Sequence, residues 1–304
     1  MIAYPNAKIN LGLRITGRLP NGYHSLETLF LPIGLKDALE IVPRSQTTPQ
    51  TEHRSGSALQ LAPADAVFTP VGQDLICIEG FADPCPPEQN LVYKALCEAR
   101  RVACVPAVQI YLRKQIPSGA GLGGGSSDAT FTLLLLNRLF NLNLSPQTLA
   151  STAARLGADC PFFLLNRPVL AKGIGNEFTP VSLPECLRSS TIAVVKPPVS
   201  ISTAQAYRLV DELPPRRFPS VAEASALTPP EWPDALGNDF ELALLPLYPE
   251  LKEIKDTLYR AGAFYAAMSG SGSAFFGLWH GSVPTSLHTL FPLEYTLWTG
   301  PLLQ

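Results

Sequence analysis

Apolar and polar residues alternate from Lys8 to Ile15, which is the pattern of a β-strand with two unlike faces. One face carries Ile9, Leu11, Leu13 and Ile15, and the other carries Lys8, Asn10, Gly12 and Arg14. Taken alone, the second face is typical of the solvent-exposed side of an edge strand. The alternation also places Lys8 and Asn10 side by side, so a functional polar pair is the alternative interpretation.

A second pattern, between residues 108 and 140, predicts a strand, a glycine-rich loop and a helix. Residues 108–112 alternate like a strand, residues 117–128 are rich in glycine, and residues 129–140 are apolar enough for a buried helix. Glycines allow backbone amides to converge, and a helix start adds unpaired N–H groups and the positive end of a dipole. The loop therefore predicts a cradle for phosphate.

Two other phosphate loops do not fit this stretch. No Gly-Lys-Ser/Thr closes it, which excludes a Walker A loop. It does not open a short βαβ unit with an acidic residue on the next strand, as a dinucleotide-binding loop does. A flexible linker is the remaining alternative, but Pro117, Leu122 and the flanking strand and helix do not suit one.

The rest of the chain mixes strands and helices without regular alternation, which favours an α+β fold. Strands are predicted at residues 26–33, 38–42, 75–78, 169–171, 191–196, 264–268, 274–278 and 294–298. Helices are predicted at residues 90–101, 146–157, 249–262 and 287–291, and also from Ser202 or Thr203 and from Asn238. Residues 43–73, 82–89 and 213–233 are expected to be long loops or irregular connectors because they are rich in proline and polar residues.

Two local features carry candidate chemistry. Pro20-Asn21-Gly22 predicts a turn that delivers Tyr23 and His24 to the start of a strand. Such a pair suits stacking on a planar ring, and it equally suits an ordinary strand start. Asp159 stands at a sharp junction between elements, where a helix N-cap is the alternative to a chemical role.

Composition narrows the classes of function. The chain has 304 residues, 46% of them hydrophobic, which suggests two domains. Its net charge of −2 argues against a nucleic acid or an anionic membrane as partner. The six cysteines include no CxxC, so reduced thiols are expected rather than metal ligands. Lys8 and Asn10 interrupt any signal peptide, and the apolar runs are too short to span a bilayer, which indicates a cytoplasmic protein.

Several stretches resemble motifs of the GHMP small-molecule kinases. Residues 117–127 resemble their phosphate loop, Pro-x-Gly/Ala-x-Gly-Leu-Gly-(small)-Ser-Ser, and residues 268–272 resemble their third motif. Residues 7–13, 22–24, 157–163 and 238–241 narrow the resemblance to the 4-diphosphocytidyl-2-C-methyl-D-erythritol kinase family. These motifs occur in the family's order over nearly the whole chain, whereas residues 43–89 look longer than is usual there.

The resemblance implies a two-domain α+β fold with the active site between the domains. Residues 1–166 would form an ATP-binding domain of the ribosomal protein S5 domain 2-like type, and residues 167–304 a ferredoxin-like domain. The implied reaction is ATP-dependent phosphorylation of the substrate's 2-hydroxyl, giving the 2-phosphate and ADP in the non-mevalonate (MEP) isoprenoid route. The implied cofactors are ATP and Mg²⁺, and the implied partner is a cytidine diphosphate-linked methylerythritol, bound by a monomer or homodimer.

The resemblance also assigns roles to residues, position by position. Asp159 matches the catalytic aspartate and Lys8 the catalytic lysine. The residues matched to the ATP-binding loop are Pro117, Ser118, Gly119, Ala120, Gly121, Leu122, Gly123, Gly124, Gly125, Ser126 and Ser127. Ser126 or Ser127 would contact Mg²⁺. The residues matched to substrate binding are Asn10, Tyr23, His24, Thr203 and Tyr207.

The chemistry of these residue types agrees with those roles. Asp159 can accept the hydroxyl proton, and Lys8 can hold Asp159 ionised and stabilise charge at the attacking oxygen. Asp128 has three interpretations, because it can cap the helix, assist the metal, or repel phosphate if it points inward.

Two further functions stay open at this point. A homoserine or mevalonate kinase would keep the loop but has no reason for Tyr23-His24 together with Tyr207. A non-catalytic nucleotide-binding regulator would keep the loop and lose Lys8 or Asp159, and both are present.

Overall fold

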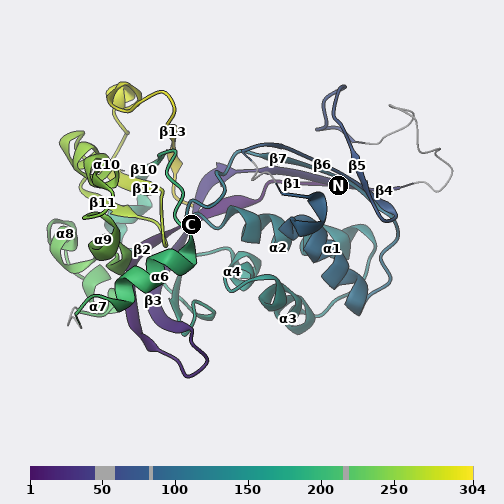
Figure 1. Ribbon diagram of the computed structural model, residues 1–304, viewed down its shortest axis with the longest axis horizontal. Coiled ribbons are helices and arrows are strands. Elements are labelled where there is room, and N and C mark those ends of the chain that lie inside the picture. The colour runs from purple at the N-terminus through teal and green to yellow at the C-terminus, as the bar shows by residue number, and fades with distance from the viewer. Residues whose placement is uncertain (45–58, 82–84, 215–218, 304) are drawn as a thin grey trace. The chain divides into compact units, whose positions relative to one another are not determined.

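The computed structural model describes residues 1–44, 59–81, 85–214 and 219–303, which fall into two compact units (Figure 1). The first unit holds Met1–Asn6, Lys36–Ser118 and Gly124–Leu165. The second holds Ala7–Leu35, Gly119–Gly123 and Asn166–Gln304. The chain passes from one unit to the other several times, and the domain boundaries at 1–166 and 167–304 stay a prediction.

The first unit is a five-stranded sheet of order β1-β4-β7-β6-β5 with helices on one side. Its strands are β1 Ile2–Ala3, β4 Ala38–Pro43, β5 Thr69–Val71, β6 Asp74–Gly80 and β7 Val108–Lys114. Its helices are the 3₁₀ turn η1 Pro87–Gln89, α1 Leu91–Val102, α2 Gly124–Leu139, α3 Pro146–Leu156 and α4 Cys160–Leu165. Figure 1 shows α1 and α2 against the sheet, with α3 and α4 beyond them.

The helices of this unit begin where local chemistry indicates. The Asn90 side chain accepts a hydrogen bond from the Val92 N–H at the start of α1, and the Ser145 side chain accepts one from Thr148 at the start of α3. Both caps confirm the predicted helix starts. The buried residues of α1 are Val92, Ala95, Leu96 and Ala99, and Leu91 is half-buried. The strands bury aliphatic residues against α1 and α2, which makes one continuous core.

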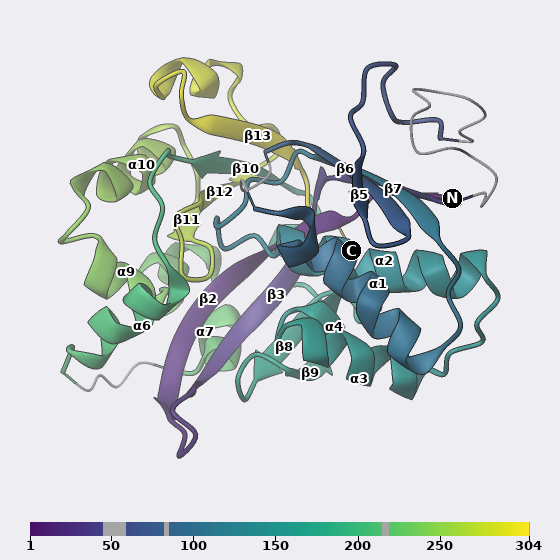
Figure 2. The same ribbon diagram turned by 45° about the vertical axis from the view of Figure 1, so that its right-hand side comes forward.

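The second unit contains two four-stranded sheets, of order β2-β3-β8-β9 and β11-β12-β10-β13. The strands of the first are β2 Asn6–Arg18, β3 His24–Lys36, β8 Val169–Lys172 and β9 Glu177–Pro180. Those of the second are β10 Ser190–Lys196, β11 Tyr265–Met268, β12 Phe275–His280 and β13 Thr296–Pro301. Figure 2 shows β2 and β3 running side by side to the turn that joins them.

Helices of the second unit pack on the antiparallel β11-β12-β10-β13 sheet and share its core. The helical segments of the unit are α5 Glu185–Arg188, α6 Thr203–Asp211, α7 Val221–Ser225, η2 Pro229–Glu231, α8 Trp232–Ala235, α9 Asp239–Leu244, α10 Pro249–Arg260 and η3 Thr285–Leu290. Ser202 caps α6 and Asn238 caps α9, which confirms both predicted starts.

Some sequence-based expectations were wrong. Residues 213–233 are not wholly irregular, because α7 and η2 form there and the Ser220 and Glu223 side chains make a capping box. The short elements β9 and α5 had no prediction, and the predicted helix at 287–291 is a 3₁₀ segment. Of the expected loops, residues 45–58, 82–84 and 215–218 lie outside the described residues.

The largest correction concerns the polar face of β2. Lys8 and Asn10 are each 3% exposed, so this face is not the wet side of an edge strand. Burying a lysine and an asparagine is costly unless both find partners, and this points to a specific role. Of the helices that the structure describes, none is both long and apolar enough to cross a membrane.

Candidate active site

Lys8 is held on the buried face of β2 by a short polar chain. Its Nζ lies 2.6 Å from Asn10 Oδ1 and 4.7 Å from the centroid of the Phe30 ring. The Asn10 Nδ2 donates to Thr28 Oγ1 at 3.1 Å, and that hydroxyl donates to the Gly12 carbonyl at 2.6 Å. The amide oxygen and the aromatic face help to hold the ammonium in place.

The middle of the glycine-rich loop, Gly119–Gly123, belongs to the same unit as Lys8. The Lys8 N–H donates to the Leu122 carbonyl at 2.9 Å, and Ser269 Oγ donates to the Gly121 carbonyl at 2.9 Å. The Asn10 N–H donates to the same Ser269 hydroxyl at 3.2 Å. The loop, the third-motif turn and the strand that carries Lys8 are thus hydrogen-bonded to one another.

Gly121 shows why this loop needs glycine. Its φ is +75°, and a Cβ built there would lie 1.9 Å from the Ser269 carbonyl oxygen. No side chain fits at that distance, and the left-handed conformation adds its own strain. Gly119 also has a positive φ, of +60°, but its Cβ would meet open space. Glycine is therefore required at Gly121 by a close backbone approach and at Gly119 by conformation alone.

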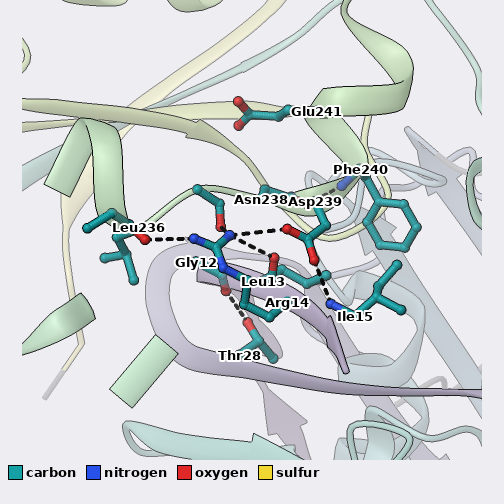
Figure 3. A network of polar contacts seen from close by, with 12 residues as sticks. Gly12, Leu13, Arg14, Ile15, Thr28, Leu236, Asn238, Asp239, Phe240 and Glu241 are labelled. Carbon is teal, nitrogen blue, oxygen red and sulfur yellow. Dashed lines mark hydrogen bonds and ion pairs between the residues drawn. The ribbon is translucent and has the colours of Figure 1, made fainter. Parts of the chain in front are cut away.

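A largely buried ion pair joins β2 to the start of α9 (Figure 3). Arg14, on β2, points its guanidinium at Asp239, with Nη1 3.2 Å from Oδ1, and also donates to the Gly237 carbonyl at 2.6 Å. Asp239 Oδ2 accepts from the Ile15 N–H at 2.7 Å. The neighbouring Asn238 donates through Nδ2 to the Met268 and Gly270 carbonyls at 2.8 Å. Sequence reasoning gave Arg14 no role.

The other part of the loop, Gly124 onward, forms the first turn of α2 in the first unit. Ser127 is fully buried, and its hydroxyl has no hydrogen-bond partner among the described residues. Ser126 is half-buried beside the Gly157 turn, where a Cβ built on Gly157 would lie 3.8 Å from Ser126 Oγ. Both serines therefore stand at a helix N-terminus with the dipole's positive end.

The same turn of α2 is tied to the segment that carries Asp159. Thr130 Oγ1 is 2.9 Å from the Ser126 carbonyl and 2.8 Å from the Cys160 carbonyl. Burial raises the pKa of the Cys160 thiol to about 11, so this cysteine stays a neutral packing residue. Asp159 itself is half-buried at the start of α4. Ser126 and the Asp159 segment are thereby brought together within the first unit.

The contacts of Asp128 decide among its three interpretations. Its Oδ2 accepts from Lys114 Nζ at 2.6 Å, and Lys114 also bonds to Asp37. Burial raises the pKa of Asp128, and the charge of Asp37 adds to this, although Lys114 acts in the opposite direction. Burial acts to lower the pKa of Lys114, but its attraction to the two carboxylates outweighs this and the pKa is raised. Asp128 points at Lys114 and not at the cradle.

The residues predicted for substrate binding are partly assembled. The His24 ring stacks on Tyr207, with centroids 4.5 Å apart and 13° between planes, and His24 Nε2 lies 2.6 Å from Asp211 Oδ1. Thr203 Oγ1 is 3.0 Å from the hydroxyl of Ser271 in the third-motif turn. Tyr23 is different, because it is 62% exposed. Asp211 was missed because a single acidic residue late in a helix carries no signal of its own.

Two other observations bear on the site. An apolar cavity of about 420 Å³ lies in the second unit, lined by Leu11, Leu29, Leu170 and Leu187 among others, and it includes none of the predicted site residues. Among the described residues, no group of three or more His, Cys, Asp or Glu side chains is placed to hold a metal ion. A dedicated protein cage for a metal is therefore absent from the described part of the chain.

Comparison with known proteins decides the family. The family model of the GHMP kinases N terminal domain matches residues 90–167, and that of the GHMP kinases C terminal matches residues 223–282. The 4-diphosphocytidyl-2-C-methyl-D-erythritol kinase of Parabacteroides distasonis is 43% identical over 302 residues, 99% of this chain and 100% of that protein. The kinase of the same name from Bacteroides thetaiotaomicron is 46% identical over 286 residues, 93% of this chain and 94% of that protein.

This chain belongs to the 4-diphosphocytidyl-2-C-methyl-D-erythritol kinase family. A crystal structure of 4-(cytidine 5'-diphospho)-2C-methyl-D-erythritol kinase aligns with a TM-score of 0.73 and 34% identity over 99% of each chain. The mevalonate kinase of Methanococcus jannaschii aligns with a TM-score of 0.71 over 100% of this chain and 98% of that one, but at 14% identity it shows the fold alone. The predicted α+β GHMP kinase fold is confirmed, and members of this family are ATP-dependent small-molecule kinases.

Proposed function

We propose that this protein transfers the γ-phosphoryl group of ATP to the 2-hydroxyl of 4-diphosphocytidyl-2-C-methyl-D-erythritol. The products are the 2-phosphate and ADP, a step of the non-mevalonate route to isoprenoid precursors. The observation that carries this proposal is identity of 43% and 46% with kinases of that name over nearly the whole chain. The buried Lys8 and the hydrogen-bonded glycine loop are what such a reaction needs from the protein.

Residues 117–127 bind the phosphates of ATP in this proposal. The positive φ angles of Gly119, Gly121 and Gly123 allow the backbone to turn so that its amides can converge on a phosphate, and the start of α2 adds its own N–H groups. Pro117 is buried, and Ser118 Oγ donates to the Phe81 carbonyl at 3.3 Å. These contacts hold the loop entrance in place before ATP arrives, which lowers the cost of ordering it.

Asp159 accepts the proton of the attacking hydroxyl, and Lys8 stabilises the charge that develops there. A carboxylate at the end of a tight turn is exposed enough to meet a substrate, and Asp159 is half-buried. The buried ammonium of Lys8, held by Asn10 and Phe30, acts in a water-poor setting where a charge is more effective. Asn10, which lies in the same polar chain between Lys8 and Thr28, contributes to substrate binding.

The serines at the start of α2 are suitable ligands for Mg²⁺. The buried Ser127 hydroxyl has no partner among the described residues, and oxygen donors are what this cation prefers. Mg²⁺ in kinases is bound mostly by phosphates and water, which agrees with the lack of a carboxylate cage in the described chain. Ser126 or Ser127 would contribute one ligand, and the ion would offset charge on the triphosphate.

The cytosine ring is bound by Tyr23, His24 and Tyr207, with Thr203 contributing a hydroxyl. The stacked His24–Tyr207 pair shows that this region already accommodates parallel rings, and exposed Tyr23 is available to cover a base. We also propose a cytoplasmic protein, monomer or homodimer, with neither nucleic acid nor membrane as partner.

A coupled ADP-release assay tests the function directly. The purified protein is assayed separately with the cytidyl substrate, mevalonate and homoserine at equal concentrations. The proposal expects kcat/KM for the cytidyl substrate to exceed the others by at least about 10³, because only that substrate offers a base to the proposed ring site. Equal turnover of mevalonate would overturn the assignment of the substrate.

A further inference from the structure

One buried ionic cluster links the two ends of the glycine-rich loop. Its members are Asp37, Lys114 and Asp128, which are 1%, 5% and 2% exposed and lie in the first unit. Lys114 ends β7 just before the loop, and Asp128 lies in α2 just past the helix's first turn. We propose that this cluster, the Asp37–Lys114–Asp128 clamp, sets the spacing of the loop's two ends and thereby its affinity for the phosphates of ATP.

Asp37 holds the entrance of the loop. Its Oδ1 accepts from the backbone N–H of Gln115 at 2.5 Å and from that of Ile116 at 2.8 Å. Its Oδ2 accepts from Lys114. One carboxylate thus fixes three consecutive residues, ending at the position before Pro117. Charge-assisted bonds of this kind are about twice as strong as neutral ones.

Lys114 joins that entrance to the exit. Its Nζ lies 2.6 Å from Asp128 Oδ2 while it also bonds to Asp37, so one ammonium bridges both sides of the loop. Gly124, the first residue of α2, packs directly on this bridge. A Cβ built on Gly124 would lie 2.8 Å from Ile116 Cγ2 and 3.2 Å from Lys114 Nζ. The two ends are therefore held at a separation that leaves no room for a side chain between them.

Stability alone does not account for such a cluster. Burying three charged groups carries a desolvation cost that their attraction barely offsets, and well-packed apolar residues would serve as well. A fixed bridge does serve a loop whose amides must converge on one phosphate, since a shift of about 1 Å there is costly. Asp128 Oδ1 also has no hydrogen-bond partner among the described residues, so the bridge is anchored at α2 through a single oxygen.

The test rests on the assignment of ATP to this loop. Asp128→Ala removes the exit anchor, and the clamp predicts that the KM for ATP rises about tenfold. The KM for the cytidyl substrate should change by less than about twofold, because that substrate is bound elsewhere. Asp128→Asn leaves an amide oxygen for Lys114 at the same distance and should restore most of the ATP affinity.

Asp74 gives a matched control in the same unit. Its carboxylate is also buried, accepts from the Val108 N–H at 2.9 Å, and pairs with Arg100 at 2.5 and 2.8 Å. It lies at the opposite end of β7 from the loop. Asp74→Ala should lower the melting temperature and leave the KM for ATP within about twofold of wild type.

The outcomes separate the clamp from the proposed function. The clamp is overturned if Asp128→Ala raises the KM for ATP no more than Asp74→Ala does, or raises both substrates' KM values equally. If Asp128→Ala does not fold, the KM for ATP of Asp128→Glu is compared with that of Asp128→Asn. Glutamate keeps the charge but changes the spacing of the loop's ends, so the clamp requires the larger rise in KM for ATP in Asp128→Glu. If the wild type turns over no substrate, the proposed function fails, and the rise in melting temperature that ATP causes still measures the clamp.

Discussion

Two buried lysines of this protein have different neighbours. Lys8, in the second unit, lies against the amide oxygen of Asn10 and the face of Phe30. Lys114, in the first unit, lies between the carboxylates of Asp37 and Asp128. Both are at most 5% exposed, so burial does not distinguish them.

The contrast gives Lys114 a structural role, and Lys8 keeps the catalytic role proposed above. The two carboxylates beside Lys114 offset its positive charge. Lys114 can therefore shape the loop but adds little positive potential for a phosphate. Lys8, whose own N–H also binds the loop at Leu122, is suited to act on developing negative charge.

Replacing each lysine with methionine should break the comparison most sharply. Lys8→Met should lower kcat by about 10²–10⁴ with little loss of stability, because methionine fills a similar volume. Lys114→Met leaves two buried carboxylates without their cation and should cost about 3–5 kcal/mol of unfolding free energy. Steady-state kinetics and urea unfolding of both variants give the two numbers.

The same experiment has a clear contrary result. If Lys8→Met unfolds as readily as Lys114→Met and retains its turnover, Lys8 is the structural lysine. Melting of each variant with and without ATP guards against mistaking an unfolded sample for an inactive one.

The two glycines Gly121 and Gly119 sharpen the comparison at the loop. Gly121→Ala places a methyl group 1.9 Å from the Ser269 carbonyl oxygen and should raise the KM for ATP by about 10² while lowering stability by about 2–4 kcal/mol. Gly119→Ala meets open space and should cost only about 1–2 kcal/mol, the strain of its positive φ. ATP kinetics and thermal melting check both. Equal effects would mean that the contact with Ser269 does not shape the loop.

Losing the aromatic ring of Tyr207 should act on one substrate only. Tyr207→Ala should weaken the cytidyl substrate by roughly 1–3 kcal/mol, the usual value of one base stacked on an aromatic ring. ATP binding should hardly change. Isothermal titration of each ligand makes the measurement, and equal weakening of both would show that Tyr207, which also packs edge-on against Phe240, is structural.

The serines of α2 should give the smallest effect. Whichever of Ser126 and Ser127 contacts Mg²⁺ should, on change to alanine, raise the Mg²⁺ concentration for half-maximal rate by roughly tenfold. The other variant should behave like wild type. Titration of Mg²⁺ at saturating ATP distinguishes them, and two silent variants would remove both serines from the metal.

The sequence predicted the features that depend only on residues close together in the chain. The caps at Asn90, Ser145, Ser202 and Asn238 need only neighbouring residues, and all four formed. The strand at β2 followed from alternation, but its burial did not, because exposure depends on what packs against a face. The element β9 was missed because it is short and mostly exposed, so it carries no apolar pattern.

The sequence could not predict which charged residues of the site pair with one another. Arg14 pairs with Asp239 across 225 positions, and Lys114 with Asp37 across 77. Nothing local marks such pairs, since each residue alone reads as a surface charge. The glycine loop was recognisable because its function needs consecutive residues, whereas Asp37 and Lys114 required the fold to bring them together.

The central claim is that Asp159 acts as a base and not as a cap. Asparagine caps a helix about as well as aspartate, so Asp159→Asn should be nearly harmless if capping is the whole role. As the proton acceptor, the same change keeps the size and removes the basicity. The deciding measurement is the turnover number of folded Asp159→Asn at saturating ATP and cytidyl substrate. The account predicts a fall of about 10²–10⁴ with an unchanged melting temperature; turnover near that of the wild type would contradict it.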